Sequence, residues 1–195
     1  MFKKYGASDK SFDSIVAFGP NSAVPHHETG KTKLHKNMPV LMDFGCVFEG
    51  YCSDMTRTVW YGDEPEKDFL DAYNAVYEAH MHAFENIVAG MNGAEADALA
   101  RDVLTQKGYG ELFTHSLGHG IGVEIHEYPW LAPKRDCVLL NGMVFSNEPG
   151  VYFDGKYGIR IEDTVCLQND SLVTFMQDDK KLIIVNDGKI KKYKS

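Results

Sequence analysis

The chain has 195 residues, 44% of them hydrophobic, and a formal net charge of −8 at pH 7. This length can bury a real core, most simply as one domain spanning residues 1–195. The acidic balance argues against a nucleic-acid partner or an anionic membrane surface. We expect neither a bilayer-spanning segment nor a leader peptide, because no stretch has the required apolar run. The expected class is therefore a cytoplasmic enzyme or binding protein.

The four cysteines agree with that class. Cys46, Cys52, Cys137 and Cys166 show no CxxC spacing, and we interpret all four as free thiols in a reducing compartment. The only basic cluster, residues 189–194, is predicted to be a solvated end.

The first predicted elements are a buried strand over residues 11–19 and a loop over residues 20–30 that is rich in turn formers. The loop carries His26 and His27. Adjacent histidines in a loop usually lie at the surface, so these two matter only if the loop folds over a site.

The stretch from residue 40 to residue 60 predicts two strands joined by a tight turn at Glu49-Gly50. In that register Phe48 pairs with Tyr51, and Gly45 lies opposite Asp54.

This register places Asp43 and Asp54 on one face as diagonal neighbours, roughly 7–8 Å apart at their origins. Gly45 supplies no side chain between them. Two carboxylates facing one space repel each other unless a cation lies there. Aspartates on a solvated hairpin face are also common, so the meaning of the pair depends on the rest of the chain.

Apolar residues recur at helical spacing over residues 66–89, and a second amphipathic helix is predicted over residues 94–107. Glycines at 90 and 108 end the two helices. We expect both helices to cover a sheet and give them no chemical role.

Residues 114–127 contain His115, His119 and His126 beside glycines at 118, 120 and 122. Glycine costs strand stability but lets the backbone approach other groups closely. A lone histidine is more often a core or surface residue than a ligand, but three beside such glycines indicate a site.

Two further strands carry acidic residues. Glu148 ends an apolar strand before Pro149-Gly150, and residues 158–167 form a strand with Arg160 and Glu162 on one face.

A turn at Asp154-Gly155 predicts a hairpin between these two strands. The Pro-Gly pair interrupts the ladder, which leaves the register of the two glutamates open. Strands over residues 171–176 and 181–185 are predicted to close the sheet.

Four carboxylates and one imidazole form the candidate ligand set: Asp43, Asp54, His119, Glu148 and Glu162. Oxygen-rich ligation with one nitrogen suits Mn²⁺ better than the thiolate or multi-histidine sites of structural zinc. Bridging carboxylates also suit a pair of ions about 3.5–4 Å apart, which can lower the pKa of a bound water and polarise a carbonyl. We expect two divalent ions, most simply Mn²⁺, with Co²⁺ or Zn²⁺ as alternatives.

Five motifs occur in order between about residue 11 and residue 167: PNSAVPHH, DFGCVFEGYCSDMTRT, HSLGHGIGVEIHE, NEPGVY and GIRIEDTV. Together they resemble the signatures of the M24 metallopeptidases, whose α+β pita-bread fold is a curved antiparallel sheet covered by helices. The SDMTRT and PHH forms are more similar to the proline-specific branch, the Xaa-Pro aminopeptidases and Xaa-Pro dipeptidases (prolidases), than to methionine aminopeptidase.

The resemblance implies a dinuclear-metal-dependent exopeptidase that hydrolyses the bond between an N-terminal residue and proline. Asp43 would chelate one ion and Asp54 would bridge both, while His119, Glu148 and Glu162 would complete the ligand shell. A hydroxide held between the ions would attack the carbonyl before proline, with Glu148 moving the proton.

The resemblance also implies residues around a peptide substrate that has proline at its second position. His26, His115 and His126 would surround that substrate, since imidazoles are suitable donors to a developing oxyanion. Arg160 would orient the ligand carboxylates.

The chain departs from the family pattern at its N-terminus. The opening helices of the first half and the separate N-terminal domain usual in proline-specific members are missing, and residues 1–10 resemble the tail of a helix. We therefore expect an uncovered apolar flank, which a homodimer, a missing N-terminal segment or a partner chain would cover. This piece alone is not assured of activity.

Three alternatives stay open: a methionine aminopeptidase, a non-catalytic peptidase-like binding module, and a metal-free hydrolase of the creatinase type. Four converging carboxylates disfavour the last two, since neither has a physical need for them.

Overall fold

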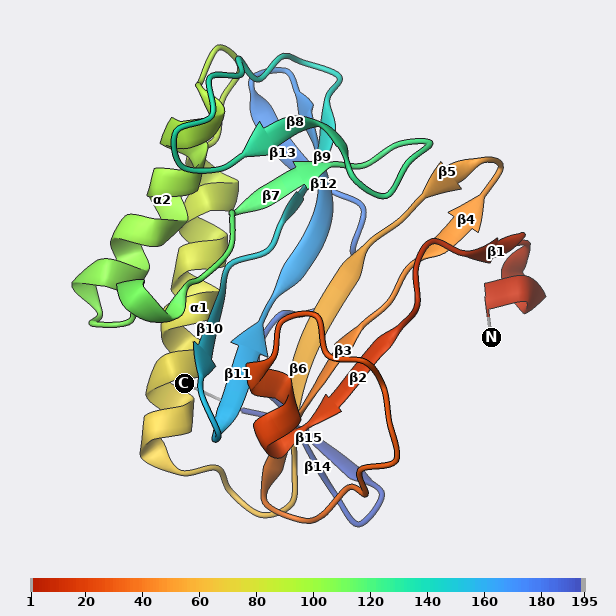
Figure 1. Cartoon of the computed structure of the whole chain (residues 1–195), viewed down its shortest axis with the longest axis vertical. Coiled ribbons are helices and arrows are strands. Elements are labelled where there is room, and N and C mark those ends of the chain that lie inside the picture. The colour runs from red at the N-terminus through yellow and green to blue at the C-terminus, as the bar shows by residue number, and fades with distance from the viewer. Residues whose placement is uncertain (1, 194–195) are drawn as a thin grey trace.

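Antiparallel strand pairing organises the chain in the computed structural model, which describes residues 2–193 (Figure 1). Strand bounds are β1 (Asp9–Lys10), β2 (Ile15–Phe18), β3 (Met38–Asp43), β4 (Cys46–Phe48), β5 (Tyr51–Cys52), β6 (Met55–Tyr61), β7 (Gly118–Gly120), β8 (Glu127–Leu131), β9 (Val144–Asn147), β10 (Gly150–Phe153), β11 (Tyr157–Arg160), β12 (Glu162–Gln168), β13 (Ser171–Thr174), β14 (Ile183–Asn186) and β15 (Lys189–Lys192). Helix bounds are α1 (Lys67–Asn86) and α2 (Gly93–Gln106), with 3-10 turns η1 (Phe2–Tyr5), η2 (Gly19–Ala23) and η3 (Gly110–Leu112).

Ten strands form one curved sheet, in the order β15-β14-β6-β12-β9-β7-β8, with β13 on β12, β3 on β6 and β2 on β3. Every pairing is antiparallel except the parallel contact between β14 and β6. Smaller ladders join β1, β4 and β5, and β10 with β11. The central strands β3, β6, β12 and β9 bring four distant segments of the sequence side by side.

Helices α1 and α2 pack together and cover one face of the sheet (Figure 1). The buried stripe of α1 is made largely of alanines, such as Ala72, Ala79 and Ala83, so the helix approaches the sheet closely. Ile159 of β11 and Val165 of β12 belong to the same core. Before β3, the described residues form 3-10 turns and short strands.

Both helices were predicted with small boundary errors. Helix α2 begins with a capping box. The Asn92 side chain accepts from the Ala94 amide, and the Glu95 carboxylate accepts from the Asn92 amide. Helix α1 ends at Asn86, earlier than predicted, and the left-handed Gly90 (φ 87°) turns the chain toward α2. None of the helices within residues 2–193 combines the length and hydropathy needed to cross a membrane.

The predicted hairpin register is confirmed. Phe48 pairs with Tyr51, and Asp43 pairs with Thr56 farther along the same register. The structural role of Gly45 differs from the predicted one, which was to leave space between Asp43 and Asp54. A Cβ there would lie 1.8 Å from the Ser53 carbonyl oxygen, so glycine is required by close backbone approach, not to leave room between carboxylates.

The two ends of the described chain differ from their predictions. Residues 2–10 form η1 and strand β1 instead of the tail of an α-helix. The basic segment predicted as a solvated end contains strand β15, whose side chains are exposed but whose backbone pairs with β14. Lys194 of that segment lies outside the described residues.

Candidate metal centre

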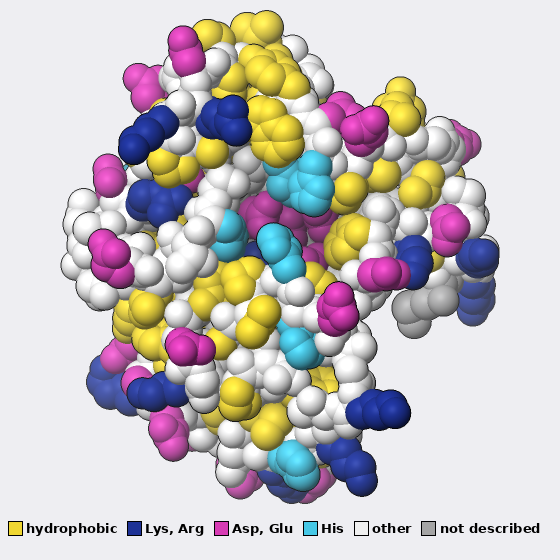
Figure 2. All heavy atoms as spheres, viewed as in Figure 1, with side chains coloured by type: hydrophobic (Ala, Val, Ile, Leu, Met, Phe, Trp, Pro, Cys, Tyr) yellow, Lys and Arg dark blue, Asp and Glu magenta, His cyan; other side chains and the backbone are white. Residues whose placement is uncertain are grey.

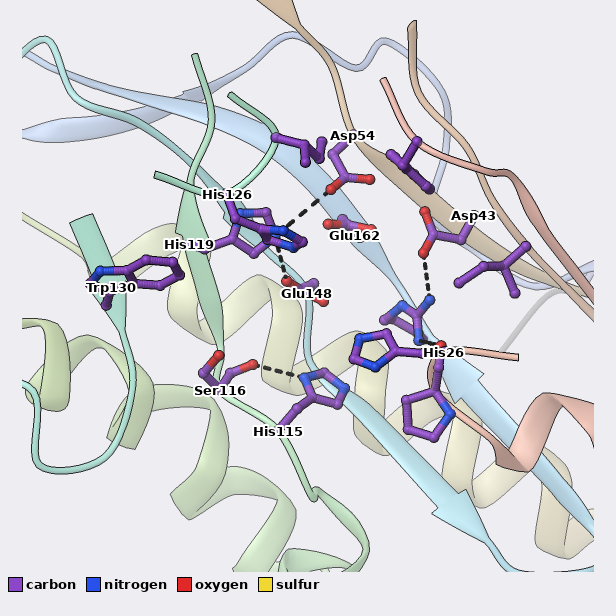
Figure 3. A pocket seen from close by; sticks show the side chains of 15 residues that line it. His26, Asp43, Asp54, His115, Ser116, His119, His126, Trp130, Glu148 and Glu162 are labelled. Atoms are coloured by element: carbon purple, nitrogen blue, oxygen red, sulfur yellow. Dashed lines mark hydrogen bonds and ion pairs between the residues drawn. The ribbon is translucent and has the colours of Figure 1, made fainter. Parts of the chain in front are cut away.

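A cavity of about 390 Å³ opens beside the central strands, and its floor is acidic with histidines around the rim (Figure 2). The nine residues predicted for the site all line this one cavity: His26, Asp43, Asp54, His115, His119, His126, Glu148, Arg160 and Glu162. Asp43 lies on β3, His119 on β7, Arg160 on β11 and Glu162 on β12, and the other five lie on connecting segments. Figure 3 shows the labelled carboxylates and histidines converging on one space.

Three carboxylates lie on or directly before three adjacent strands, β3, β6 and β12. Thr56 of β6 pairs with Asp43 at the end of β3 and with Glu162 at the start of β12. Asp54 lies two residues before Thr56, so its side chain projects from the same face. Thr164, two residues beyond Glu162, bonds the backbone of Asp54 through its hydroxyl. Strand register alone therefore gathers these carboxylates.

The register between Glu148 and Glu162, which the sequence left open, is continuous across the proline. Asn147 pairs with Asp163, the Ile161 amide donates to the Pro149 carbonyl, and Gly150 pairs with Arg160. Glu148 therefore lies opposite Glu162, on the same face of the ladder.

His119 lies on β7 between two closely packed neighbours. A Cβ at Gly118 would lie 1.9 Å from the Ser146 carbonyl oxygen, and one at Gly120 would lie 2.2 Å from that of Tyr128. The glycines therefore let β7 fit tightly beside its neighbours. The Nδ1 of His119 donates to the Gly120 carbonyl at 3.1 Å, because a carbonyl can only accept.

That tautomer leaves Nε2 of His119 free to accept. It lies 3.3 Å from Oε1 of Glu148 and 3.8 Å from Oδ2 of Asp54. Within the part of the chain that the structure describes, ligand atoms of Asp54, His119 and Glu162 all lie within 4.8 Å of one another. This spacing is suitable for one ion held by two carboxylates and an imidazole.

Three buried carboxylate oxygens have no hydrogen-bond partner among the described residues: Asp43 Oδ1, Asp54 Oδ1 and Glu162 Oε1. Buried charged oxygens without partners are costly unless a cation neutralises them. Asp43 and Glu148 lie outside the tightest group, since Asp43 Oδ2 accepts from Arg160 at 2.6 Å and Glu148 Oε1 accepts from Ser146 at 3.0 Å. The residues present therefore fit divalent metal, with a three-residue centre and two further carboxylates beside it.

The pKa shifts report the same crowding of negative charge. Burial, then the charges of Asp43 and Glu148, raises the pKa of Asp54 to about 8. Burial also raises the pKa of Asp43 and of Glu162, the latter well above its ordinary value. Burial acts to raise the pKa of Glu148, but the neighbouring His119, His115 and Arg160 lower it to about 2. The pKa of Glu148 is therefore shifted in the opposite direction from those of Asp43, Asp54 and Glu162.

A hydrogen-bonded chain connects His115 to the metal-centre carboxylates. Nδ1 of His115 donates to the Ser116 carbonyl at 2.8 Å, so Nε2 accepts from the Tyr152 hydroxyl at 2.8 Å. The hydroxyl in turn accepts from Nη1 of Arg160 at 2.8 Å, and the same guanidinium holds Asp43. Burial lowers the pKa of His115, which favours the neutral ring that this arrangement needs.

The other two predicted histidines lie at the cavity mouth. The ring of His126 packs edge-on against that of His119, with centroids 4.2 Å apart, and burial followed by the charge of His119 lowers its pKa. His26 is exposed at the end of the loop that the sequence analysis placed conditionally over a site. Both rings face the space beside the carboxylates (Figure 3).

Sequence reasoning missed Thr56 and Tyr152. The Thr56 hydroxyl donates to Glu162 at 2.6 Å and accepts from Nε of Arg160 at 3.1 Å. The signal that could have found them was strand alternation: Thr56 is two residues from Asp54, and Tyr152 is four from Glu148.

Helix α2 was also given no chemical role, yet it holds the segment that carries His115. Arg101 donates to the carbonyls of Phe113 and His115, each at 2.8 Å, and pairs with Asp97. Asp97 accepts from the Leu117 amide at 2.9 Å. The i, i+4 spacing of Asp97 and Arg101 was visible, but nothing in the sequence indicated their loop partners.

The curved sheet, its helical cover and the carboxylate–imidazole cluster together define a metallopeptidase-type pita-bread domain. The chain belongs to metallopeptidase family M24, whose sequence pattern matches residues 1–169. It is 44% identical over 168 residues to an uncharacterized peptidase of Staphylococcus aureus (strain USA300), covering 86% of this chain and 48% of that protein.

Solved structures of proline-specific peptidases are similar throughout the described fold. An Xaa-Pro dipeptidase from Bacillus anthracis has a TM-score of 0.91 at 46% identity, covering 94% of this chain and 51% of that one. An X-Pro aminopeptidase from Thermotoga maritima MSB8 has a TM-score of 0.89 at 40% identity, with coverage of 94% and 52%. The chain thus spans about half the length of the relatives that it matches.

Proposed function

We propose that this chain carries the metal-binding and catalytic residues of an exopeptidase that hydrolyses the bond between an N-terminal residue and proline, with two divalent ions. The observation that carries the proposal is the set of unpartnered, buried oxygens on Asp43, Asp54 and Glu162 around the free Nε2 of His119. Proline specificity is supported by the names of the similar structures, an Xaa-Pro dipeptidase and an X-Pro aminopeptidase.

The metal ligands in this proposal are Asp43, Asp54, His119, Glu148 and Glu162. Bound divalent ions would lower the pKa of a water and polarise the substrate carbonyl. Mn²⁺ is the proposed ion because the donor set is rich in oxygen, with Co²⁺ or Zn²⁺ as alternatives.

Glu148 is the proposed proton carrier. Its carboxylate faces the same cavity as the ligand atoms of Asp54 and His119, so that it could take a proton from a water held there. Ser146 donates to it at 3.0 Å and fixes its orientation at the cavity wall.

Imidazoles at the cavity mouth would contact the substrate carbonyl. His26 and His126 have rings at the rim that can donate to a developing oxyanion. His115 lines the same cavity, and its hydrogen bond with Tyr152 holds Arg160 and hence Asp43 in place.

The partner and location remain predictions. They are a peptide with proline at its second position, a homodimer or an additional segment over the apolar flank, and the cytoplasm. Size-exclusion chromatography with light scattering tests the dimer, and cell fractionation tests the location.

A hydrolysis panel of Ala-Pro, an Ala-Pro peptide and a Met-Ala peptide with added Mn²⁺ tests the function. We expect cleavage before proline in one or both of the first two, and none of Met-Ala. Preferred cleavage of Met-Ala would instead identify a methionine aminopeptidase. A protein that binds two ions but cleaves none of the three would favour the non-catalytic binding module.

A further inference from the structure

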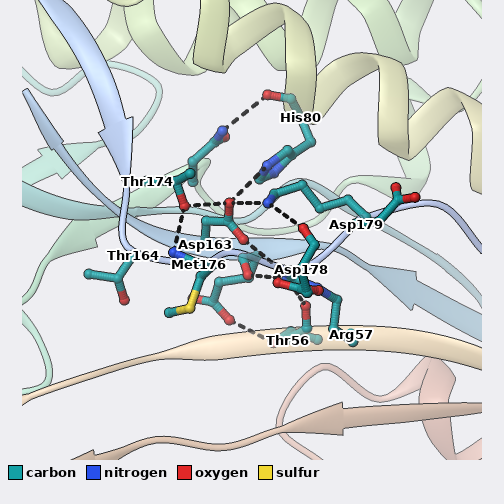
Figure 4. A network of polar contacts seen from close by, with 12 residues as sticks. Thr56, Arg57, His80, Asp163, Thr164, Thr174, Met176, Asp178 and Asp179 are labelled. Carbon is teal, nitrogen blue, oxygen red and sulfur yellow. Dashed lines mark hydrogen bonds and ion pairs between the residues drawn. The ribbon is translucent and has the colours of Figure 1, made fainter.

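Arg57 of β6 points away from the cavity, because successive residues of a strand face opposite sides of the sheet. It lies in a buried polar network between the sheet and helix α1 (Figure 4). The guanidinium has five N–H groups, and all of them have acceptors. Nε donates to Asp178, Nη1 to the Thr56 and Glu162 carbonyls, and Nη2 to Asp163 and Asp178.

The two carbonyls belong to residues that meet at the metal centre. Thr56 and Glu162 are paired across β6 and β12, and that ladder contains only one other pair, Met55 with Asp163. Nη1 of Arg57 reaches the Thr56 carbonyl at 2.8 Å and the Glu162 carbonyl at 2.6 Å. A single nitrogen therefore joins the two strands where their own pairing is short.

The same two residues also bond to each other on the cavity side. The Thr56 hydroxyl donates to Oε2 of Glu162 at 2.6 Å, which leaves Oε1 as the unpartnered oxygen. Arg57 bonds both backbones on the opposite face of the sheet, and this fixes the Thr56 hydroxyl and the Glu162 carboxylate relative to each other. A shift of either backbone would turn Glu162 Oε1 away from Asp54 and His119.

Asp178 holds the guanidinium in the orientation that this contact needs. It accepts from Nε at 2.6 Å and from Nη2 at 2.8 Å, the two-bond geometry of an Arg–carboxylate pair. Lysine cannot reproduce this arrangement, since it has one nitrogen and three donors. The pattern of donors therefore makes arginine specific at this position.

We propose that Arg57 is a positioning residue for Glu162, setting the geometry of the metal centre from the opposite face of the sheet. The inference rests on the proposed metal centre. Partners of this kind, one step removed from the ion, typically change metal affinity by about 10- to 100-fold when they are replaced.

The test is a calorimetric titration of the metal-free protein with Mn²⁺, together with Arg57→Lys and the control Lys180→Gln. Lys180 contacts Asp163 at 2.9 Å in the same network but touches neither Thr56 nor Glu162 among the described contacts. We expect Arg57→Lys to weaken Mn²⁺ binding by about 10- to 100-fold. Lys180→Gln should change the Mn²⁺ affinity by less than about threefold. We expect both variants to be less stable than wild type in urea unfolding.

Asp178→Asn provides a second variant if Arg57→Lys does not fold. It keeps the shape of the side chain but removes the charge that orients the guanidinium, so weaker Mn²⁺ binding is again expected. Equal affinity in wild type and both folded variants would overturn the positioning role. An equal loss in Lys180→Gln would also overturn it, because the effect would then follow general stability. Absence of Mn²⁺ binding in the wild type would instead refute the proposed metal centre itself.

Discussion

Asp54 lies in an unfavourable electrostatic position in the metal-free site. It is 5% exposed, and the negative charges of Asp43 and Glu148 add to its burial in raising its pKa to about 8. The folded protein therefore keeps a proton that the unfolded chain, with a pKa near 3.8, has already lost at neutral pH. Since the folded state binds more protons in this range, its stability falls as the pH rises toward the folded-state pKa and beyond.

We predict that metal-free protein loses about 1 kcal/mol of unfolding free energy between pH 7 and pH 9 through Asp54. Glu162 and His119 also have raised pKa values, so they lower the stability in the same direction as the pH rises. Urea unfolding in the presence of a chelator measures the total slope. Asp54→Asn should reduce this slope and be more stable than wild type at pH 9. A slope that is unchanged in Asp54→Asn would show that Asp54 is not the titrating group.

His115 allows substrate chemistry to be separated from metal binding. Its ring nitrogens bond Ser116 and Tyr152 rather than any of the metal-centre carboxylates. We predict that His115→Ala lowers turnover of Ala-Pro by about 100-fold, because the Tyr152 hydroxyl loses its acceptor and small displacements beside the reacting groups are costly. The metal content measured after dialysis should stay at the wild-type level. Loss of metal from this variant would place His115 in the ligand shell.

At the scale of elements, helix α2 does more than cover the sheet. Arg101 and Asp97 bond the backbone at Phe113, His115 and Leu117, so the helix sets where the segment before β7 lies. A lysine at position 101 cannot bond two carbonyls and a carboxylate in this geometry.

Arg101→Lys is therefore predicted to lower kcat/KM about tenfold, because small displacements of catalytic groups are costly. The affinity for Mn²⁺ should change by less than about threefold, since no ligand carboxylate is touched. Lys107→Gln is the matched control, because it removes an exposed ion pair between α2 and Glu78 of α1. Equal losses of kcat/KM in the two variants would argue against a specific anchoring role for Arg101.

Strand registers decided which parts of the site could be foreseen. The Glu49-Gly50 turn was enough to predict the pairing of Phe48 with Tyr51, because short turns restrict register. The Pro149-Gly150 step hid the register of Glu148, since proline cannot donate to a ladder. In the structure the Pro149 carbonyl still accepts from Ile161, and the pairing continues without a shift.

Across the whole molecule, local signals and the family resemblance together predicted the helices, most strands and nine of the fifteen residues that line the cavity. They could not predict Arg101 bonding a loop beyond its own helix, or Arg57 bonding a carbonyl 105 residues away. Such contacts depend on how strands far apart in sequence become neighbours, which residue periodicity does not encode. The reason for Gly45 likewise became clear only with the Ser53 carbonyl beside it.

The central claim is that Asp43, Asp54, His119, Glu148 and Glu162 together hold divalent metal. Anomalous diffraction at the manganese edge, from crystals grown with Mn²⁺, tests it most directly. We predict two peaks about 3.5–4 Å apart in the cavity, with Asp54 between them, and loss of both in Asp54→Ala. Manganese bound elsewhere on the protein, or peaks that persist in Asp54→Ala, would contradict the account.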